Sequence, residues 1–214
     1  TILKVGGSIS DVYATKVLKK DNQGYINIPE SGELDMETVN PVYLGRTTPD
    51  FLLGWNNSFS YKGFGLSFLL SGRFGGIVNS STEAILDRFG VSKNSAIARD
   101  NGGVNLPGQG KYNAKKYYEA VATGKSETAG YYTYDATNVR LQELTLSYTF
   151  PAKWFKNYID ELTLSLIGNN LWMIYNKAPF DPELTPSTAT YGQGNDYFMQ
   201  PSLRSVGFNI KAKL

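Results

Sequence analysis

The stretch that decides the fold runs from residue 51 to residue 74 and reads FLLGWNNSFSYKGFGLSFLLSGRF. In both halves, large apolar side chains alternate with small or polar ones, which is the period-two pattern of a strand with one apolar face. The Lys62-Gly63 pair between the halves is typical of a tight hairpin turn. Each half has about ten residues, whereas a soluble strand usually has about five or six and a membrane-crossing strand about nine to eleven. The stretch therefore predicts a hairpin of two long antiparallel strands, 51–61 and 64–74.

The same alternation recurs elsewhere in the chain. It is clear in VRLQELTLSYTF (139–150), in ELTLSLIGNNLW (161–172) and in the last ten residues, and it is weaker in VGGSISDVYATKV (5–17). We predict an all-β fold in which about six long antiparallel strands form a segment of a large transmembrane β-barrel. The predicted strands are 7–19, 51–61, 64–74, 138–150, 159–172 and 203–214.

The two faces of these strands differ in chemistry. One carries large apolar side chains, and the other is mostly Ser, Thr, Gly and Asn rather than the Lys, Glu and Arg typical of a soluble sandwich. Small polar residues suit the water-filled or plugged interior of a wide barrel, which leaves the apolar face to contact lipid. From the pattern alone, a soluble sandwich stays open as an alternative. The positions predicted to face lipid are Phe51, Leu53, Trp55, Phe59, Phe64, Leu66, Phe68, Leu70, Leu144, Leu146, Tyr148, Leu162, Leu164 and Leu166.

Long and short connections alternate along the chain. The Lys62-Gly63 turn and the segment 151–158 are short, and aromatic residues gather beside both. Outer-membrane barrels have short periplasmic turns, long extracellular loops and girdles of aromatic residues at the membrane interfaces. We therefore predict extracellular loops at 20–50, 75–137 and 173–202.

The composition removes most catalytic chemistry. The 214 residues include no His and no Cys, so Ser-His-Asp and Cys-His nucleophile systems, Cys/His zinc sites and Fe–S ligation are excluded within this chain. The net charge of +2 gives no strong attraction to nucleic acid. No stretch approaches the roughly 18–20 apolar residues of a spanning helix. We predict that the chain is not an enzyme and that it has no catalytic, metal-binding or cofactor-binding residues and no nucleic-acid partner.

The last strand carries a further pattern. A polar residue, a glycine and then alternating apolar residues up to the end are typical of the C-terminal assembly signal of outer-membrane barrels. The usual last residue of that signal is aromatic, and this chain has a leucine there instead. The residues assigned to the signal are Gly207, Phe208, Ile210, Ala212 and Leu214.

These segments, taken in order, resemble one family. VRLQELTLSYTFP (139–151), IGNNLWMIYNKAPFDPEL (167–184) and DYFMQPSLRSVGFNIKAKL (196–214) resemble the C-terminal end of the SusC/RagA-type TonB-dependent outer-membrane transporters of Bacteroidetes. LGRTTPDFLLGWNNSFSYKGFGLSFLLSGRFGG (44–76) resembles a strand pair of the same family, and VSKNSAIARDNGGV (91–104) is similar to the extracellular loop that follows it.

The resemblance implies a function that the periodicity does not show. Such proteins have a signal peptide, a plug domain and a 22-stranded barrel, and they import glycans or peptides with energy delivered by TonB. A SusD-like surface lipoprotein covers the extracellular mouth. Residues 1–214 would then be the C-terminal part of the barrel, with the plug and signal peptide absent from them. The implied partners are the rest of the barrel and its plug, the SusD-like lipoprotein, TonB through the N-terminal part, outer-membrane lipid, and a glycan or peptide substrate.

The loops supply the remaining candidates. In the loop 75–137 we expect one helix at 83–89, capped by Thr82, and another at 114–122, capped by Asn113 and followed by Gly124. The carboxylates Asp181 and Glu183 are two residues apart, which allows a Ca²⁺ site but favours a loop-ordering role. Loop tyrosines are candidates for stacking on sugar rings or for protein contacts. The residues singled out as loop or partner contacts are Arg99, Asp100, Tyr117, Tyr118, Asp181, Glu183 and Arg204.

For Arg99 and Asp100, a structural ion pair or loop anchor is the favoured interpretation, and for Arg204 it is an anchor at the entry to the last strand.

Two functional alternatives stay open beside transport. One is a related outer-membrane barrel that serves as an adhesin or assembly scaffold, and the other is a soluble all-β carbohydrate-binding module.

Overall fold

The protein is represented by a computed structural model that describes residues 2–122, 130–155, 158–184, 186 and 193–213. The chain forms two compact units, each assembled from three separate segments. We call the first the loop unit; it comprises Thr1–Thr48, Gly76–Asp135 and Pro182–Gln200. We call the second the sheet unit; it comprises Pro49–Gly75, Ala136–Asp181 and Pro201–Leu214.

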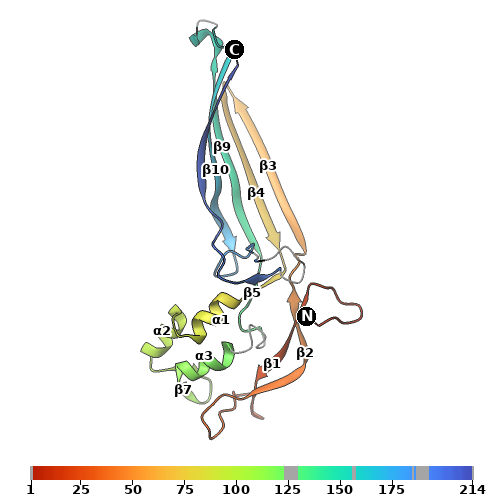
Figure 1. The fold of residues 1–214 in the computed structure, drawn as a ribbon. Coiled ribbons are helices and arrows are strands. Elements are labelled where there is room, and N and C mark those ends of the chain that lie inside the picture. The colour runs from red at the N-terminus through yellow and green to blue at the C-terminus, as the bar shows by residue number, and fades with distance from the viewer. Residues whose placement is uncertain (1, 123–129, 156–157, 185, 187–192, 214) are drawn as a thin grey trace. The chain divides into compact units, whose positions relative to one another are not determined.

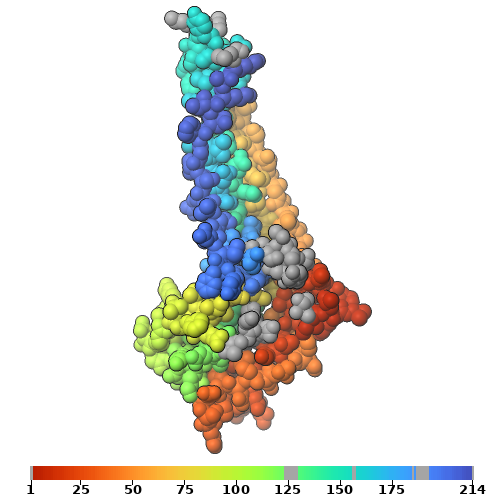
Figure 2. All heavy atoms as spheres, viewed as in Figure 1, coloured from red at the N-terminus to blue at the C-terminus, as the bar shows by residue number. Residues whose placement is uncertain are grey.

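The sheet unit is one antiparallel sheet of five strands in the order β12-β10-β9-β4-β3. Figures 1 and 2 show β12 and β3 at its two edges. A 3₁₀ turn, η1 (Ala152–Phe155), follows β9. The strands are β3 (Phe51–Tyr61), β4 (Phe64–Phe74), β9 (Asn138–Pro151), β10 (Glu161–Asn176) and β12 (Ser205–Lys213).

The Lys62-Gly63 turn joins β3 to β4, and Tyr61 pairs with Phe64 directly beside it. Both turn residues have positive φ, 49° at Lys62 and 86° at Gly63. This matches the turn type that follows the right-handed twist of paired strands. A Cβ on Gly63 would lie 2.8 Å from the carbonyl oxygen of Thr149, so glycine is required here both by the backbone conformation and by the available space.

The first two strands do not join this sheet. Among the described residues, β1 (Asp11–Leu18) pairs with β2 (Met36–Arg46) alone, in a two-stranded sheet that belongs to the loop unit. The predicted strand 7–19 thus contains β1, which does not join the five-stranded sheet in the described residues, and the predicted loop 20–50 contains a strand, β2. That these segments belong to the barrel wall and to an extracellular loop stays a prediction. β2 was missed because METVNPVYLGR lacks alternation and contains Pro41, a residue largely confined to edge strands and bulges. The register shifts between Ala14 and Lys16, which places Pro41 within an irregularity of the pairing.

The loop unit carries all three α-helices of the described residues. Its other strands form a three-stranded sheet, ordered β11-β5-β8, and a β6–β7 hairpin. The helices are α1 (Ser81–Arg88), α2 (Lys93–Asp100) and α3 (Ala114–Ala122). The strands are β5 (Ile77–Ser80), β6 (Val104–Leu106), β7 (Gly110–Tyr112), β8 (Thr133–Asp135) and β11 (Asn195–Asp196). Together these elements position the polar groups described below.

The core of the loop unit forms around α3. Its buried members include Ala84, Ala98, Tyr117, Val121 and Tyr132. Spacings of three and four residues along α3 place its apolar side chains on one stripe, which is the usual way in which a short helix joins a core.

Side-chain caps begin the helices. Asn113 Oδ1 accepts a hydrogen bond from the backbone N–H of Lys116 at 3.1 Å, so the predicted cap and the predicted range 114–122 are confirmed. The first helix begins earlier than predicted, because Ser80 rather than Thr82 accepts the N–H of Glu83. The α2 helix was not predicted. The predicted stop at Gly124 lies outside the described residues.

Two smaller observations complete the fold. β10 runs on to Asn176, so the connection after it begins later than the predicted 173. No helix among the described residues is long and apolar enough to cross a membrane.

Candidate functional site

The apolar side chains of the sheet unit line up across all five strands. The register pairs Phe59 with Leu66, Leu66 with Leu146, Leu146 with Leu166, and Leu166 with Phe208. Directly paired residues of antiparallel strands lie on the same face. The five strands therefore share one continuous apolar face. The neighbouring row on this face consists of Tyr61, Phe64, Tyr148, Leu164 and Ile210.

Most large side chains of this face are exposed in the chain by itself. Phe59 is 57% exposed, Leu146 48% and Leu166 52%. Soluble monomers rarely expose a contiguous apolar patch larger than a few hundred Å². The strand registers place every position that was predicted to face lipid on this one face, with Asn57 as a polar interruption. Their contact with lipid stays a prediction.

The opposite face is built mainly from small uncharged side chains. One of its rows consists of Ser60, Gly65, Ser147, Ser165 and Asn209. The hydroxyl oxygens of Thr149 and Thr163 lie 2.9 Å apart across β9 and β10. Leu52, Leu69 and Ile167 are large apolar exceptions on this face. Its hydroxyls and amides suit contact with water or with polar protein groups.

Aromatic rings gather at one end of the sheet, beside the Lys62-Gly63 turn and η1. The ring centroids of Phe64 and Tyr148 are 4.5 Å apart, and those of Tyr148 and Phe150 are 4.7 Å apart. Trp154 on η1 continues the series, 5.6 Å from Phe150. Such a belt is typical of the interface between membrane and water.

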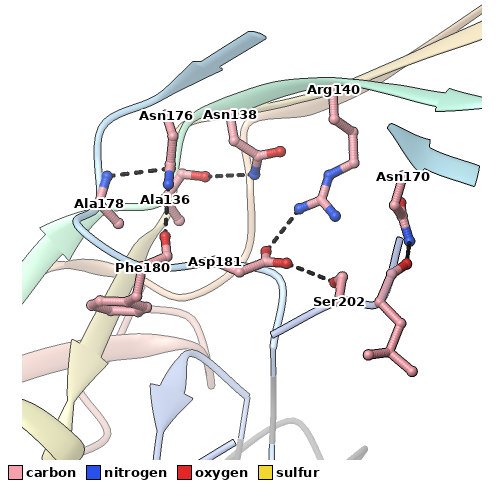
Figure 3. A network of polar contacts seen from close by, with 10 residues as sticks. Ala136, Asn138, Arg140, Asn170, Asn176, Ala178, Phe180, Asp181 and Ser202 are labelled. Carbon is pink, nitrogen blue, oxygen red and sulfur yellow. Dashed lines mark hydrogen bonds and ion pairs between the residues drawn. The ribbon is translucent and has the colours of Figure 1, made fainter. Parts of the chain in front are cut away.

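A polar network orders the other end of the sheet (Figure 3). Arg140 on β9 forms an ion pair with Asp181, with 2.8 Å between Nη2 and Oδ1, and their side chains are 6% and 9% exposed. The hydroxyl of Ser202 donates to the other carboxylate oxygen at 2.6 Å. In the same region, the side-chain amide of Asn176 donates to the carbonyl of Phe180 at 2.6 Å. A single carboxylate thus ties β9 to the segments that follow β10 and precede β12.

Of the two carboxylates predicted at 181 and 183, this network includes Asp181. Both oxygens of Asp181 are occupied by Arg140 and Ser202, which agrees with a loop-ordering role. Glu183 is exposed and belongs to the loop unit rather than to the sheet unit. Arg140 was missed, because an arginine inside an alternating strand pattern gives no sign of the partner it meets 41 residues later.

The last strand pairs along its whole length with β10. Phe208, Ile210 and Ala212 face Leu166, Leu164 and Leu162 in register, and Gly207 lies on the opposite face. Leu214 of the predicted assembly signal lies outside the described residues.

Arg204, predicted to anchor the entry to this strand, has an exposed side chain. The anchoring comes instead from two consecutive asparagines of β10. Asn170 donates to the carbonyl of Leu203 at 3.2 Å, and Asn169 donates to the hydroxyl of Ser205 at 3.1 Å.

In the loop unit, a buried carboxylate joins α1 to α2 and to the segment before β8. Asp87 is 2% exposed and accepts hydrogen bonds from the hydroxyls of Tyr132, at 3.0 Å, and Ser92. Burial raises the pKa of Tyr132, and the neighbouring carboxylate of Asp87 raises it further. The phenol therefore stays protonated and remains a hydrogen-bond donor at neutral pH. A second buried carboxylate, Asp196, accepts from Ser80 at 2.9 Å.

A second group of polar side chains lies near Asp87. The carboxylate of Glu83 accepts hydrogen bonds from the hydroxyl of Tyr134 and from the side-chain amide of Asn94, the latter at 3.4 Å. The hydroxyl of Tyr117 donates to that of Tyr131 at 3.1 Å. Burial is also the main cause that raises the pKa of Tyr131 and Tyr134.

The remaining residues predicted as loop or partner contacts lie on α2 and α3. Arg99 donates to the carbonyl of Gly90 at 2.6 Å, which is the contact of a loop anchor, and Asp100 is exposed at the end of α2. Tyr117 and Tyr118, predicted as partner or substrate contacts, are only 7% and 8% exposed and belong to the core. They were misplaced because a tyrosine pair in a long loop does not show which helix face will be covered.

Comparison with known proteins gives the following relatives. No protein-family model matches the chain. The TonB-dependent receptors P3 and P39 of Formosa agariphila are 25% and 26% identical to it, over 96% and 93% of its length. The chain spans only 21% and 20% of these two receptors, about a fifth of each.

Solved structures share the fold. A structure of the RagAB peptide transporter aligns with 94% of the chain at a TM-score of 0.57 and 16% identity, and the chain covers 22% of it. A structure of the RagAB peptide importer in the "open-open" state aligns with 96% at a TM-score of 0.58 and 17% identity, again with 22% covered. The fold is thus that of an all-β barrel segment, and the sequence relatives and shared fold confirm the chain's resemblance to the C-terminal part of SusC/RagA-type TonB-dependent receptors.

Proposed function

We propose that this chain forms part of the wall and the extracellular rim of a TonB-dependent importer in the outer membrane of a Gram-negative bacterium. One observation carries the proposal: a continuous, exposed apolar face lies opposite a face of small polar residues across five long antiparallel strands. This arrangement fits a wall between lipid and an aqueous or plugged interior. The relatives, which are named as receptors and transporters, support transport over catalysis.

The sheet edges support a larger assembly. Within the described residues, β3 and β12 each pair on one side only. Unpaired backbone groups are too costly in hydrocarbon, so sheets span membranes only as closed barrels. We propose that further strands of the same barrel close both edges and that a plug fills the interior. The length of the relatives agrees with this.

The proposed partners follow from the family. A SusD-like surface lipoprotein would cover the rim, and TonB would act through an N-terminal part of the receptor. The substrate would be a glycan or a peptide. RagAB is a peptide transporter and importer, which supports an import role for the related fold. The homologues in Formosa support a bacterium of the Bacteroidetes as the source.

The dependence on a membrane environment tests the proposal. The chain produced alone should aggregate in aqueous buffer and require detergent. The receptor that contains it should migrate differently in gel electrophoresis before and after heating, as folded barrels do. A monodisperse, folded monomer without detergent would overturn the proposal and favour a soluble carbohydrate-binding module. A folded barrel whose removal leaves TonB-dependent uptake unchanged would favour an adhesin or scaffold.

A further inference from the structure

A cavity of about 840 Å³ opens in the loop unit, among α1, α2, α3, the β6–β7 hairpin and the segment leading into β8. This volume lies within the range of about 300–1,000 Å³ that is usual for small-molecule sites. The residues that matter for its chemistry are Glu83, Asn94, Asn101, Asn105, Tyr131 and Tyr134. All of them belong to the loop unit, and Tyr131 and Tyr134 are among the loop tyrosines predicted from the sequence as candidates for stacking on sugar rings or for protein contacts.

The polar lining consists mainly of amides around the carboxylates of Glu83 and Asp87, and the carboxylate of Asp87 already accepts hydrogen bonds from Tyr132 and Ser92. Tyr134 and Asn94 both donate to Glu83, which holds the carboxylate in place as an acceptor. Asn101 and Asn105 are exposed, and each side-chain amide offers a donor and an acceptor. The ammonium of Lys111 is bound to the backbone carbonyl of Asn101. The cavity therefore offers mostly neutral donors and acceptors, together with the carboxylate of Glu83.

An aromatic ring stands at this cavity in a fixed orientation. Tyr131 is 41% exposed, and its ring packs edge-on against Tyr132, with centroids 4.9 Å apart. Its hydroxyl accepts the hydrogen bond from Tyr117. The ring is thus fixed by its contacts with Tyr132 and Tyr117 while the residue stays partly exposed, so it can offer an apolar surface without a large loss of side-chain entropy on binding.

We propose that this cavity is a binding subsite for a neutral sugar unit of an oligosaccharide. Vicinal hydroxyls of a sugar match several amides and one carboxylate within a single cavity, and the apolar face of the ring matches an exposed aromatic side chain. Extended peptides are commonly held by pairing with a strand edge, whereas the groups assembled here are side chains.

The proposal rests on the proposed function in that the loop unit must reach the extracellular medium. The test uses the whole receptor in detergent, titrated calorimetrically with a panel of neutral oligosaccharides built from glucose, galactose, mannose or xylose, and in parallel with a mixture of short peptides. We expect at least one oligosaccharide to bind. Asn105→Ala and Tyr131→Ala should each weaken that binding about tenfold, a loss of about 1.4 kcal/mol.

Two further variants separate recognition from folding. Tyr131→Phe keeps the ring and should retain most of the affinity. Tyr197→Ala removes an exposed tyrosine that packs on Phe198 and does not line the cavity, so it should leave binding unchanged. Asn105 is exposed, so its replacement should not disturb the fold.

The proposal is overturned if no oligosaccharide of the panel binds, if Asn105→Ala and Tyr131→Ala bind as well as the wild type, or if these changes weaken peptide binding instead. Each of those results leaves the proposed transport function standing, because that function depends on the sheet unit and on TonB-dependent uptake. Conversely, if the chain produced alone folded without detergent, the transport proposal would fail. The calorimetric titration of the receptor would still test the sugar subsite.

Discussion

The guanidinium of Arg140 lies 2.8 Å from Oδ1 of Asp181, although the two residues are 41 positions apart, and less than a tenth of either side chain is exposed. A carboxylate this well covered depends on its partner, since the desolvation of each charge is offset by the other, and Ser202 adds a hydrogen bond to the carboxylate. The pair fixes the end of β9 against the residues that follow β10.

Loss of one member of this pair should be costly. Asp181→Ala leaves the Arg140 guanidinium without its carboxylate, and breaking a buried pair in this way costs about 3–5 kcal/mol. The expected result is a lower unfolding midpoint of the receptor in detergent, with faster amide exchange at the end of β9. The matched control is Lys115→Ala, which breaks the exposed Lys115–Glu119 pair at 3.9 Å and should change little. Equal effects of the two changes would contradict the role assigned to Asp181.

Neighbouring residues on β4 test the assignment of the two faces. Leu66→Arg should destabilise the barrel in lipid by about 2–4 kcal/mol, the usual cost of arginine on a lipid face near the midplane. Ser67→Arg should be far milder, because Ser67 lies on the opposite, polar face. Urea unfolding in vesicles measures both changes. Similar losses at positions 66 and 67 would refute the predicted lipid-facing set.

The hairpin turn depends on glycine. Gly63→Ala places a Cβ 2.8 Å from the Thr149 carbonyl oxygen at a residue with φ of 86°, so the backbone must shift. We expect a loss of at least about 1 kcal/mol in unfolding free energy. Gly54→Ala in the adjoining strand is the control, since its Cβ would meet nothing within 4 Å. If Gly54→Ala were the more harmful change, the turn geometry would have to be revised.

The hydrogen bond from Tyr132 to Asp87 should stabilise the loop unit. Tyr132→Phe keeps the ring but removes a donor to a carboxylate that is 2% exposed, and an unsatisfied buried acceptor costs about 1–3 kcal/mol. Faster amide exchange in α1 and α2 is the expected readout. Tyr197→Phe, at an exposed position, should leave exchange unchanged.

The same bond predicts a dependence on alkaline pH. The pKa of Tyr132 in the folded chain is raised above the ordinary 10.0, mainly by burial and then by Asp87. The stability that it provides is therefore complete below about pH 10 and is lost as the pH rises beyond that value. The unfolding free energy of the Tyr132→Phe variant should fall less steeply over this pH range than that of the wild type. A steeper fall in the variant would contradict the upward direction of the pKa shift.

Much of the sheet unit was predictable because its information is local. Alternation along β3 and β4 specifies which side chains share a face, and the Lys62-Gly63 pair specifies how the strands are joined. The Asn113 cap of α3 was predictable for the same reason, since the cap and the N–H that it binds lie three residues apart. Strand β2 was not, because Pro41 interrupts its pattern and its only partner in the described residues is β1.

The candidate sites also differ in whether local sequence or tertiary packing determines them. The sequence by itself determined the period-two faces, the tight turn and the absence of His and Cys chemistry, because each of these is a property of residue order or residue type. Only the tertiary structure decided that Arg140 meets Asp181, that Tyr117 is core while Tyr131 is open, and that Glu83 lines a cavity together with Asn105. These relationships join residues from separate elements, and they depend on how helices and strands pack rather than on any spacing along the chain.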